Sequence, residues 1–150
     1  MPDKSPKGFY ESLCGILGED FPAISKARSE SASMVERLER ITRNGKNDDA
    51  AVAPLIPADT SIVMFGSLAR REWTLGSDVD WTLLVDGQAD PHHRLAAREF
   101  ENRLRQEKLK EPGPAGVFGN VSFSHELIHC IGGEQDTKGA LKNNMNKLFL

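Results

Sequence analysis

The first clear pattern along the chain is helical. Apolar or small side chains recur every three or four residues from Ile24 to Ile41, and charged side chains occupy the positions between them. This spacing predicts an amphipathic N-terminal helix over residues 23–44. The preceding residues 1–22 contain several prolines and glycines, and we expect them to form a loosely ordered lead-in to the domain.

Three short segments with the composition of strands follow this helix. Residues 61–65 are a run of strand-forming side chains that ends at Gly66 and Ser67. Residues 79–85 are almost continuously apolar and predict a buried strand. Residues 117–124 alternate apolar with more polar side chains, which predicts a third strand.

Helices are predicted between these strands. Residues 67–74 have room for two helical turns, and Asp90 followed by Pro91 is a capping pattern for a helix that runs to about Lys110. The order of elements predicts an α/β (α+β) fold, in which a small mixed β-sheet is flanked by helices. We assign residues 23–150 to this single domain, with the N-terminal helix as its first element.

Composition narrows the class of protein. The chain has 150 residues, of which 39% are hydrophobic and 27% charged, as in an ordinary globular domain. Its net charge of −3 disfavours a nucleic-acid partner without excluding one. Such a partner could use a local basic face formed by Arg94, Arg98, Arg103, Arg105 and Lys108, although the acids between them favour an ordinary exposed helix face. No apolar run approaches the roughly 20 residues that a membrane span requires. Two cysteines and an N-terminus without an apolar signal stretch favour the cytoplasm.

The chemically most informative segment joins the first two predicted strands. A strand there ends at Gly66 and Ser67, where a helix is predicted to begin, so backbone N–H groups and the positive end of the helix dipole face outward. Glycine lets another group approach the backbone closely, and the serine hydroxyl adds a donor. These features predict a seat for phosphate groups, whose oxygens the guanidinium of Arg70 can also hold.

Asp78 and Asp80 stand at the start of the second predicted strand. Because side chains alternate along a strand, both carboxylates are predicted to point to the same face. Two adjacent carboxylates repel each other, and a divalent cation relieves that repulsion. Since Mg²⁺ binds through one or two carboxylates together with substrate phosphates, the sequence predicts a nucleotide site that uses Mg²⁺ or Mn²⁺.

The segment from Phe65 to Asp80 resembles the nucleotidyltransferase fold of the DNA polymerase β superfamily, whose motif is an apolar residue, Gly, then Gly or Ser, a helix, and Asp-x-Asp or Asp-x-Glu. More narrowly, it is similar to the N-terminal catalytic domain of bacterial uridylyltransferases that modify the PII signalling protein, and to related nucleotidyltransferases. The residues that match the narrower motif are Gly66, Arg70, Glu72, Ser77, Asp78 and Asp80. Ser67 replaces a glycine, as the superfamily motif allows, whereas Ala69 and Trp73 depart from the narrower motif.

This resemblance implies an enzyme that moves an NMP group from an NTP, with ATP or UTP favoured, to an acceptor hydroxyl and releases pyrophosphate. The acceptor it implies is a protein or a small molecule. The residues it implies for nucleotide binding are Gly66, Ser67, Arg70 and Ser77, and those for the metal and catalysis are Asp78, Asp80 and a third carboxylate.

The third carboxylate is not evident in the sequence. The superfamily places it on a later strand or at its end, and no acidic residue lies within residues 117–124. Glu126 is the nearest candidate, both as a metal ligand and as the group that accepts the proton. Asp86 fits better in a turn with Gly87.

Glu126 also belongs to a competing motif. His125, Glu126 and His129 form a literal H-E-x-x-H, in which two histidines on one helical face bind zinc and the glutamate acts as general base. A third zinc ligand is expected downstream, but Gln135 occupies the position of the third histidine in one such family. A zinc metallohydrolase is therefore the least favoured hypothesis.

A non-catalytic nucleotide-binding or interaction module is the main alternative. The missing third acid favours it, and so does the shortness of the chain, which suggests a piece of a larger protein. The C-terminal residues 148–150 are apolar and are expected to dock against a partner or a further domain.

Overall fold

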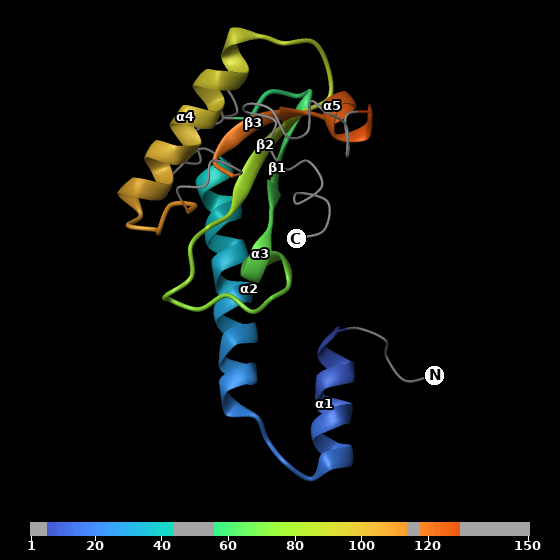
Figure 1. Cartoon of the computed structure of the whole chain (residues 1–150). Helices are drawn as coiled ribbons and strands as arrows, with labels where there is room; N and C mark the ends of the chain where they lie inside the picture. Colours follow the sequence, from blue (N-terminus) through green and yellow to red (C-terminus); the bar gives the residue numbers. More distant parts are fainter. Residues whose placement is uncertain (1–5, 44–55, 114–117, 130–150) are drawn as a thin grey trace.

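The computed structural model describes residues 6–43, 56–113 and 118–129. The predicted end of the first helix at Asn44, the helical pattern over residues 141–149, the apolar C-terminus and Cys130 lie outside these ranges. The described elements, in chain order, are α1 (Pro6–Leu17), α2 (Pro22–Thr42), β1 (Thr60–Met64), α3 (Gly66–Ala69), β2 (Trp81–Val85), α4 (Pro91–Gln106), β3 (Asn120–Phe123) and α5 (Ser124–His129), as Figure 1 shows.

The three strands form one mixed sheet in the order β1-β2-β3. β1 runs antiparallel to β2, with Met64 opposite Trp81. β2 runs parallel to β3, with Thr82 opposite Asn120. The parallel pair requires a crossover, and α4 supplies it. The predicted fold class, a small mixed sheet flanked by helices, is confirmed.

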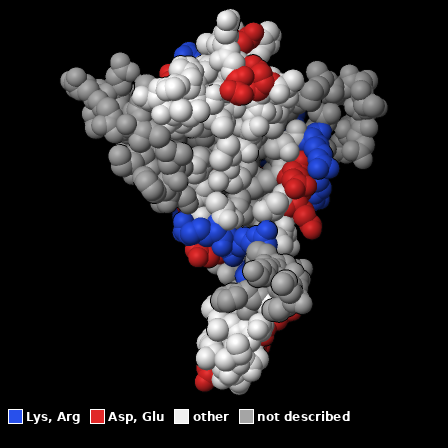
Figure 2. Space-filling model, turned by 90° about the vertical axis from the view of Figure 1, so that its right-hand side faces the viewer, with Lys and Arg blue, Asp and Glu red and all other residues white. Residues whose placement is uncertain are grey.

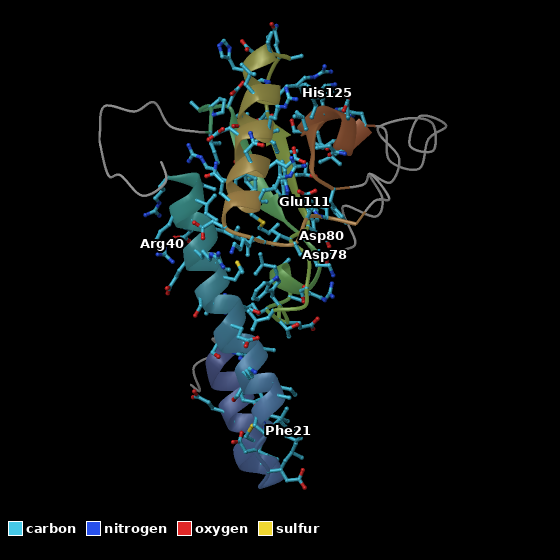
Figure 3. All side chains as sticks on the ribbon, turned by 90° about the vertical axis from the view of Figure 1, so that its left-hand side faces the viewer. Phe21, Arg40, Asp78, Asp80, Glu111 and His125 are labelled. Carbon is cyan, nitrogen blue, oxygen red and sulfur yellow. The ribbon has the colours of Figure 1, made fainter. Side chains whose placement is uncertain are left out.

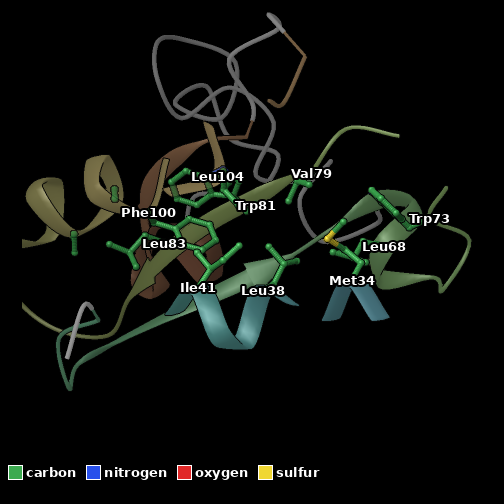
Figure 4. Close-up of a cluster of buried hydrophobic side chains, with 12 residues drawn as sticks. Met34, Leu38, Ile41, Leu68, Trp73, Val79, Trp81, Leu83, Phe100 and Leu104 are labelled. Atoms are coloured by element: carbon green, nitrogen blue, oxygen red, sulfur yellow. The ribbon is translucent and has the colours of Figure 1, made fainter. Parts of the chain in front are cut away.

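One face of the sheet packs against α2 and α4 to form the core (Figure 4). The predicted apolar stripe of α2 is buried from Ser31 to Ile41, whereas Ile24, at its other end, is half exposed. The edge of Trp81 meets the ring of Phe100 on α4 at a centroid distance of 4.9 Å. The buried core side chains are Met34, Leu38, Ile41, Leu68, Trp73, Val79, Trp81, Leu83, Ala96, Ala97, Phe100 and Leu104.

The start of α4 follows the predicted capping pattern. The side chain of Asp90 accepts a hydrogen bond from the backbone N–H of His92 at 2.7 Å, and Pro91 is the first helical residue. The backbone N–H of Asp90 donates in turn to Nδ1 of His93 at 3.2 Å, which completes a reciprocal cap. This cap fixes where the crossover leaves β2.

The prediction of a loosely ordered lead-in over residues 1–22 is wrong for residues 6–17, where α1 forms, and its first five residues lie outside the described ranges. Of the described prolines and glycines that suggested an irregular segment, Pro6, Gly18 and Pro22 stand at helix boundaries, and Gly8 and Gly15 lie within α1. Pro6 is the first helical residue, where its missing N–H costs nothing. Gly18 follows the helix with a φ of 66° and donates its N–H to the carbonyl of Cys14.

Contacts with α2 hold α1 in place. The hydroxyl of Tyr10 donates to the carbonyl of Phe21 at 2.9 Å, and the guanidinium of Arg28 lies 5.3 Å from the centre of the Tyr10 ring. Figure 1 shows α1 and the first half of α2 as a helical pair that extends away from the sheet. None of the described helices combines the length and the apolar character that crossing a bilayer demands.

Two elements near the predicted chemistry are shorter than expected. α3 is a single turn rather than two, because Arg70 ends it and Arg71 then adopts a φ of 60°. β2 begins at Trp81 rather than at residue 79. The predicted third strand is likewise confined to β3, within the described part of residues 117–124.

Candidate cation and nucleotide site

Asp78 and Asp80 lie in an extended segment that leads into β2. Val79 between them is fully buried, and its N–H donates to the carbonyl of Lys110 at 3.0 Å. The carbonyl of Asp80 accepts from the N–H of Phe65 at 2.9 Å, which extends the β1–β2 pairing by one residue. The two carboxylates therefore point away from the core on one side, where Figure 3 shows them close together.

Gly66 and Asp80 lie in direct proximity. A Cβ atom added to Gly66 would stand only 2.8 Å from Oδ2 of Asp80, and the backbone of Gly66 has a φ of 62°. Both observations exclude any other residue here without strain. The turn between β1 and α3 therefore brings its backbone against the acidic segment, so the glycine–serine corner and the Asp78–Asp80 pair form one site.

Asp78 and Asp80 are not neutralised by an ion pair within the described ranges. Neither carboxylate forms an ion pair or side-chain hydrogen bond with another residue in the described ranges. Burial raises the pKa of Asp80, and the negative charge of Asp78 raises it further. The two carboxylates therefore lie together without a salt bridge to a described arginine or lysine, and the ammonium of Lys110, a nearby cation, donates to the carbonyl of Gly76 instead.

The other residues predicted to bind nucleotide lie around this corner. The Ser67 side chain is half-buried beside Gly66. Arg70, which ends α3, donates through Nε to Glu72 at 2.9 Å, and both side chains are exposed. The hydroxyl of Ser77 accepts from the N–H of Thr74 at 3.2 Å and closes the turn that leads to Asp78. Ser77 thus has a local structural role.

Glu126 is not brought to the Asp78–Asp80 pair. Residues 82 to 85 of β2 lie opposite residues 120 to 123 of the parallel β3, so Glu126, on α5, lies beyond the C-terminal end of β2. Asp78 and Asp80 precede the N-terminal end of that strand. The prediction that Glu126 completes the metal site is therefore corrected: a parallel strand carries its downstream residues away from the start of its neighbour.

No other acid within the described ranges takes that place. In them, no group of three or more His, Cys, Asp or Glu side chains is arranged to hold a metal ion. Glu111 follows Lys110, whose carbonyl accepts from the N–H of Val79, but the Glu111 carboxylate accepts a hydrogen bond from Arg105, which lowers the pKa of Glu111. The described acidic ligands available to a cation are therefore Asp78 and Asp80.

This donor set fits Mg²⁺. Mg²⁺ prefers oxygen ligands, binds through one or two carboxylates, and obtains the rest from waters and substrate phosphates. The cradle at Gly66 leaves backbone rather than a side chain beside Asp80. The Asp80 carboxylate therefore lies against backbone at Gly66, with no side chain of that residue between it and a bound cation.

The H-E-x-x-H residues do not form a described metal centre. His125 and His129 lie on the short helix α5 and are both exposed. His125 stacks near the ring of Phe123 at a centroid distance of 5.8 Å. The described ranges offer them no third ligand, and Gln135 falls outside these ranges.

Two features of the site were not foreseen from the sequence. The ring of Phe118 lies 5.1 Å from that of Phe65, and Phe65 lies next to Asp80, to whose carbonyl its N–H donates. The hydroxyl of Thr82 is buried without a hydrogen-bond partner. The period-two continuation of the acidic pair to residue 82 is a signal that could have pointed to Thr82.

Two of the basic residues near the end of α4 are paired with acids, whereas Arg94 and Arg98 are exposed and form no ion pair within the described ranges. Arg103 pairs with Glu99, and Arg105 pairs with Glu101 and Glu111. On the face drawn in Figure 2, which is the side of the molecule away from α4, basic and acidic side chains also lie next to one another.

Comparison with known proteins identifies the family. Residues 24–129 match the family described as "Putative nucleotidyltransferase DUF294". No curated protein and no solved structure matches the chain. Because the family match spans well over half of the chain, the chain belongs to this family. The broad resemblance to nucleotidyltransferases is thereby confirmed, and the narrower likeness to uridylyltransferases stays a prediction.

Proposed function

We propose that this member of the nucleotidyltransferase family transfers an NMP group from an NTP to an acceptor hydroxyl in a Mg²⁺-dependent reaction. One observation carries the proposal: two carboxylates without a described ion-pair partner, Asp78 and Asp80, lie at a glycine corner, and the Asp80 carboxylate packs directly against the Gly66 backbone. Burial and the charge of Asp78 raise the pKa of Asp80, and a carboxylate perturbed in this way is typical of a functional site.

Each part of the site has a chemical task in this proposal. Asp78 and Asp80 would hold the cation, which when bound neutralises charge on the phosphates and lowers the pKa of the acceptor hydroxyl. Gly66 and Ser67 would orient the phosphates through the backbone and the Ser67 hydroxyl. Arg70, at the end of α3, would leave its ion pair with Glu72 and bind a phosphate oxygen instead. Breaking that pair costs little free energy, because both side chains are exposed to solvent.

The likeness to the uridylyltransferase motif supports ATP or UTP as donor and a protein or small molecule as acceptor. The paired arginines of α4 make a nucleic-acid acceptor less favoured. We therefore propose that a protein or a small molecule, rather than a nucleic acid, supplies the acceptor hydroxyl at the Asp78–Asp80 pair.

The test is release of pyrophosphate from each of the four NTPs with Mg²⁺ present. The double variant Asp78→Asn/Asp80→Asn is expected to lose at least about a thousandfold of this activity, because the cation loses its charged ligands. The matched control is Glu19→Gln/Asp20→Asn, which removes the same charge from two exposed positions and is expected to retain full activity. Wild-type turnover by the Asp78→Asn/Asp80→Asn variant, folded as judged by circular dichroism, would disprove the mechanism.

A non-catalytic nucleotide-binding module is the second candidate, favoured by the lack of a third carboxylate among the described residues. Calorimetry with each NTP and Mg²⁺ separates the two. The non-catalytic module would be supported if NTP binding depends on Asp78 and Asp80 but no pyrophosphate is released, even when a cell extract is added as a source of acceptors.

A further inference from the structure

The hydroxyl of Thr82 is a buried polar group without a partner. The Thr82 side chain is 1% exposed, and its Oγ1 forms no hydrogen bond. A buried hydroxyl left unpaired destabilises a fold by about 1–3 kcal/mol. Such groups are uncommon in folded proteins, and an ion or water that they bind is a frequent explanation.

The position of Thr82 connects it to the cation site. Side chains alternate along β2 and the extended segment before it, so Thr82 shares a face with Asp80 rather than with the apolar core. Thr82 lies between Val63 on β1 and Asn120 on β3. Its polar neighbours on this face are therefore the carboxylate of Asp80 along the strand and the amide of Asn120 across from it.

Asn120 belongs to a small polar group on β3. Its Oδ1 accepts a hydrogen bond from the hydroxyl of Ser122 at 3.4 Å, and Ser122 is itself buried. The alternation of β3 puts both side chains on the face that carries Thr82. Thr82 and Asn120 thus put oxygen atoms from two strands at the position that follows Asp80 on this face, and Ser122 bonds Asn120 from the next position along β3.

We propose that Thr82 and Asn120 hold a water molecule of the cation's hydration shell next to Asp80, so that neutral oxygen groups take the place of a third acidic ligand. Mg²⁺ keeps several of its waters when bound to proteins. A buried water requires two to four polar partners, and Asp80, Thr82 and Asn120 supply three. This inference rests on the proposed function, because it assumes a cation at the Asp78–Asp80 pair.

The test is the affinity of the full chain for Mn²⁺ without nucleotide, measured by calorimetry. Thr82→Val keeps the shape of the side chain and removes the hydroxyl, and it is expected to weaken Mn²⁺ binding about tenfold. The same variant is expected to have a higher Tm than the wild type, because an unsatisfied buried group is gone. Thr82→Ser, which restores a hydroxyl, is expected to bind Mn²⁺ within about twofold of the wild type.

Asn120→Asp tests the other neutral donor in the opposite direction. A carboxylate at this position is expected to tighten Mn²⁺ binding about tenfold or more. It is also expected to lower the Tm without metal, because it adds a third negative charge, and to give a larger increase in Tm when Mn²⁺ is added.

The control is Thr60→Val at the opposite end of the sheet. The Thr60 hydroxyl donates to the carbonyl of Pro57 at 2.8 Å, so this variant is expected to lower the Tm and leave Mn²⁺ binding unchanged. Unchanged Mn²⁺ affinity in Thr82→Val, with binding lost in Asp80→Asn, would overturn the inference and leave the proposed function standing. Absence of Mn²⁺ binding by the wild type would overturn both.

Discussion

Carboxylates lie near both ends of β2, and the two groups differ in whether their side chains have hydrogen-bond partners. Beyond the C-terminal end, Asp59 accepts from the buried ring of His93, Asp86 accepts from the Ser124 hydroxyl at 2.7 Å, and Asp90 caps α4. Before the N-terminal end, Asp78 and Asp80 have no side-chain partner within the described ranges. Acidic residues are therefore structural at one end and available to a ligand at the other.

Glycines sharpen this contrast. An added Cβ at Gly87 would lie 3.1 Å from Oδ2 of Asp59, and one at Gly66 would lie 2.8 Å from Oδ2 of Asp80. At both ends of β2 a carboxylate thus packs against a glycine. Of these two glycines, Gly66 has a left-handed backbone and Gly87 does not. Close approach of a carboxylate to a backbone does not by itself mark a binding site; what distinguishes Asp80 is that it remains uncompensated.

The largest predicted effect comes from Gly66→Ala. The alanine requires a left-handed backbone and meets the Asp80 carboxylate, so we expect a loss of about 2–4 kcal/mol in the free energy of unfolding, measured by urea denaturation. Mn²⁺ affinity is expected to fall as well. Gly87→Ala, without the positive φ, is expected to cost about 1 kcal/mol or less and to leave Mn²⁺ binding unchanged. If Gly66→Ala and Gly87→Ala changed Mn²⁺ affinity equally, the cation site could not be assigned to the N-terminal end of β2.

The next effect concerns His93, which is 3% exposed and bonded through both ring nitrogens. Its Nδ1 accepts from a backbone N–H, so the ring proton lies on Nε2 and is donated to Asp59. We expect His93→Phe to lower the free energy of unfolding by about 1–2 kcal/mol with Mn²⁺ affinity intact. His92→Ala, at an exposed position, serves as control and is expected to change stability by less than about 0.5 kcal/mol. Loss of Mn²⁺ binding in His93→Phe would show that the two ends are coupled.

The smallest effect is a pH dependence at Asp80. Its pKa is raised in the folded state, so the folded protein binds more protons than the unfolded chain between the ordinary and the raised pKa, and stability falls as pH rises through that window. Asp80→Asn is therefore expected to have a Tm a few degrees above the wild type at pH 7, and this difference should vanish at pH 3. A lower Tm for Asp80→Asn at pH 7 would mean that the carboxylate has a stabilising partner.

Local pattern was sufficient for the elements whose determinants are close in sequence. The three- to four-residue spacing of α2, the Asp90–Pro91 cap of α4 and the apolar strands all depend on neighbouring residues. The same reliance on local pattern explains why α1 was not predicted. Prolines and glycines at helix boundaries resemble those of an irregular segment. The contacts of Tyr10 with Phe21 and Arg28, which hold α1 in place, join residues of two different helices.

For the site, the sequence by itself determined which chemistry was present: a glycine corner, an acidic pair at period two, and their spacing. These are properties of one continuous segment, and alternation along a strand is enough to put both carboxylates on one side. Tertiary structure decided everything that depends on strand pairing. The parallel register of β2 and β3 removed Glu126 from the pair and put Thr82 opposite Asn120, because register couples residues far apart in the chain and no local pattern encodes it.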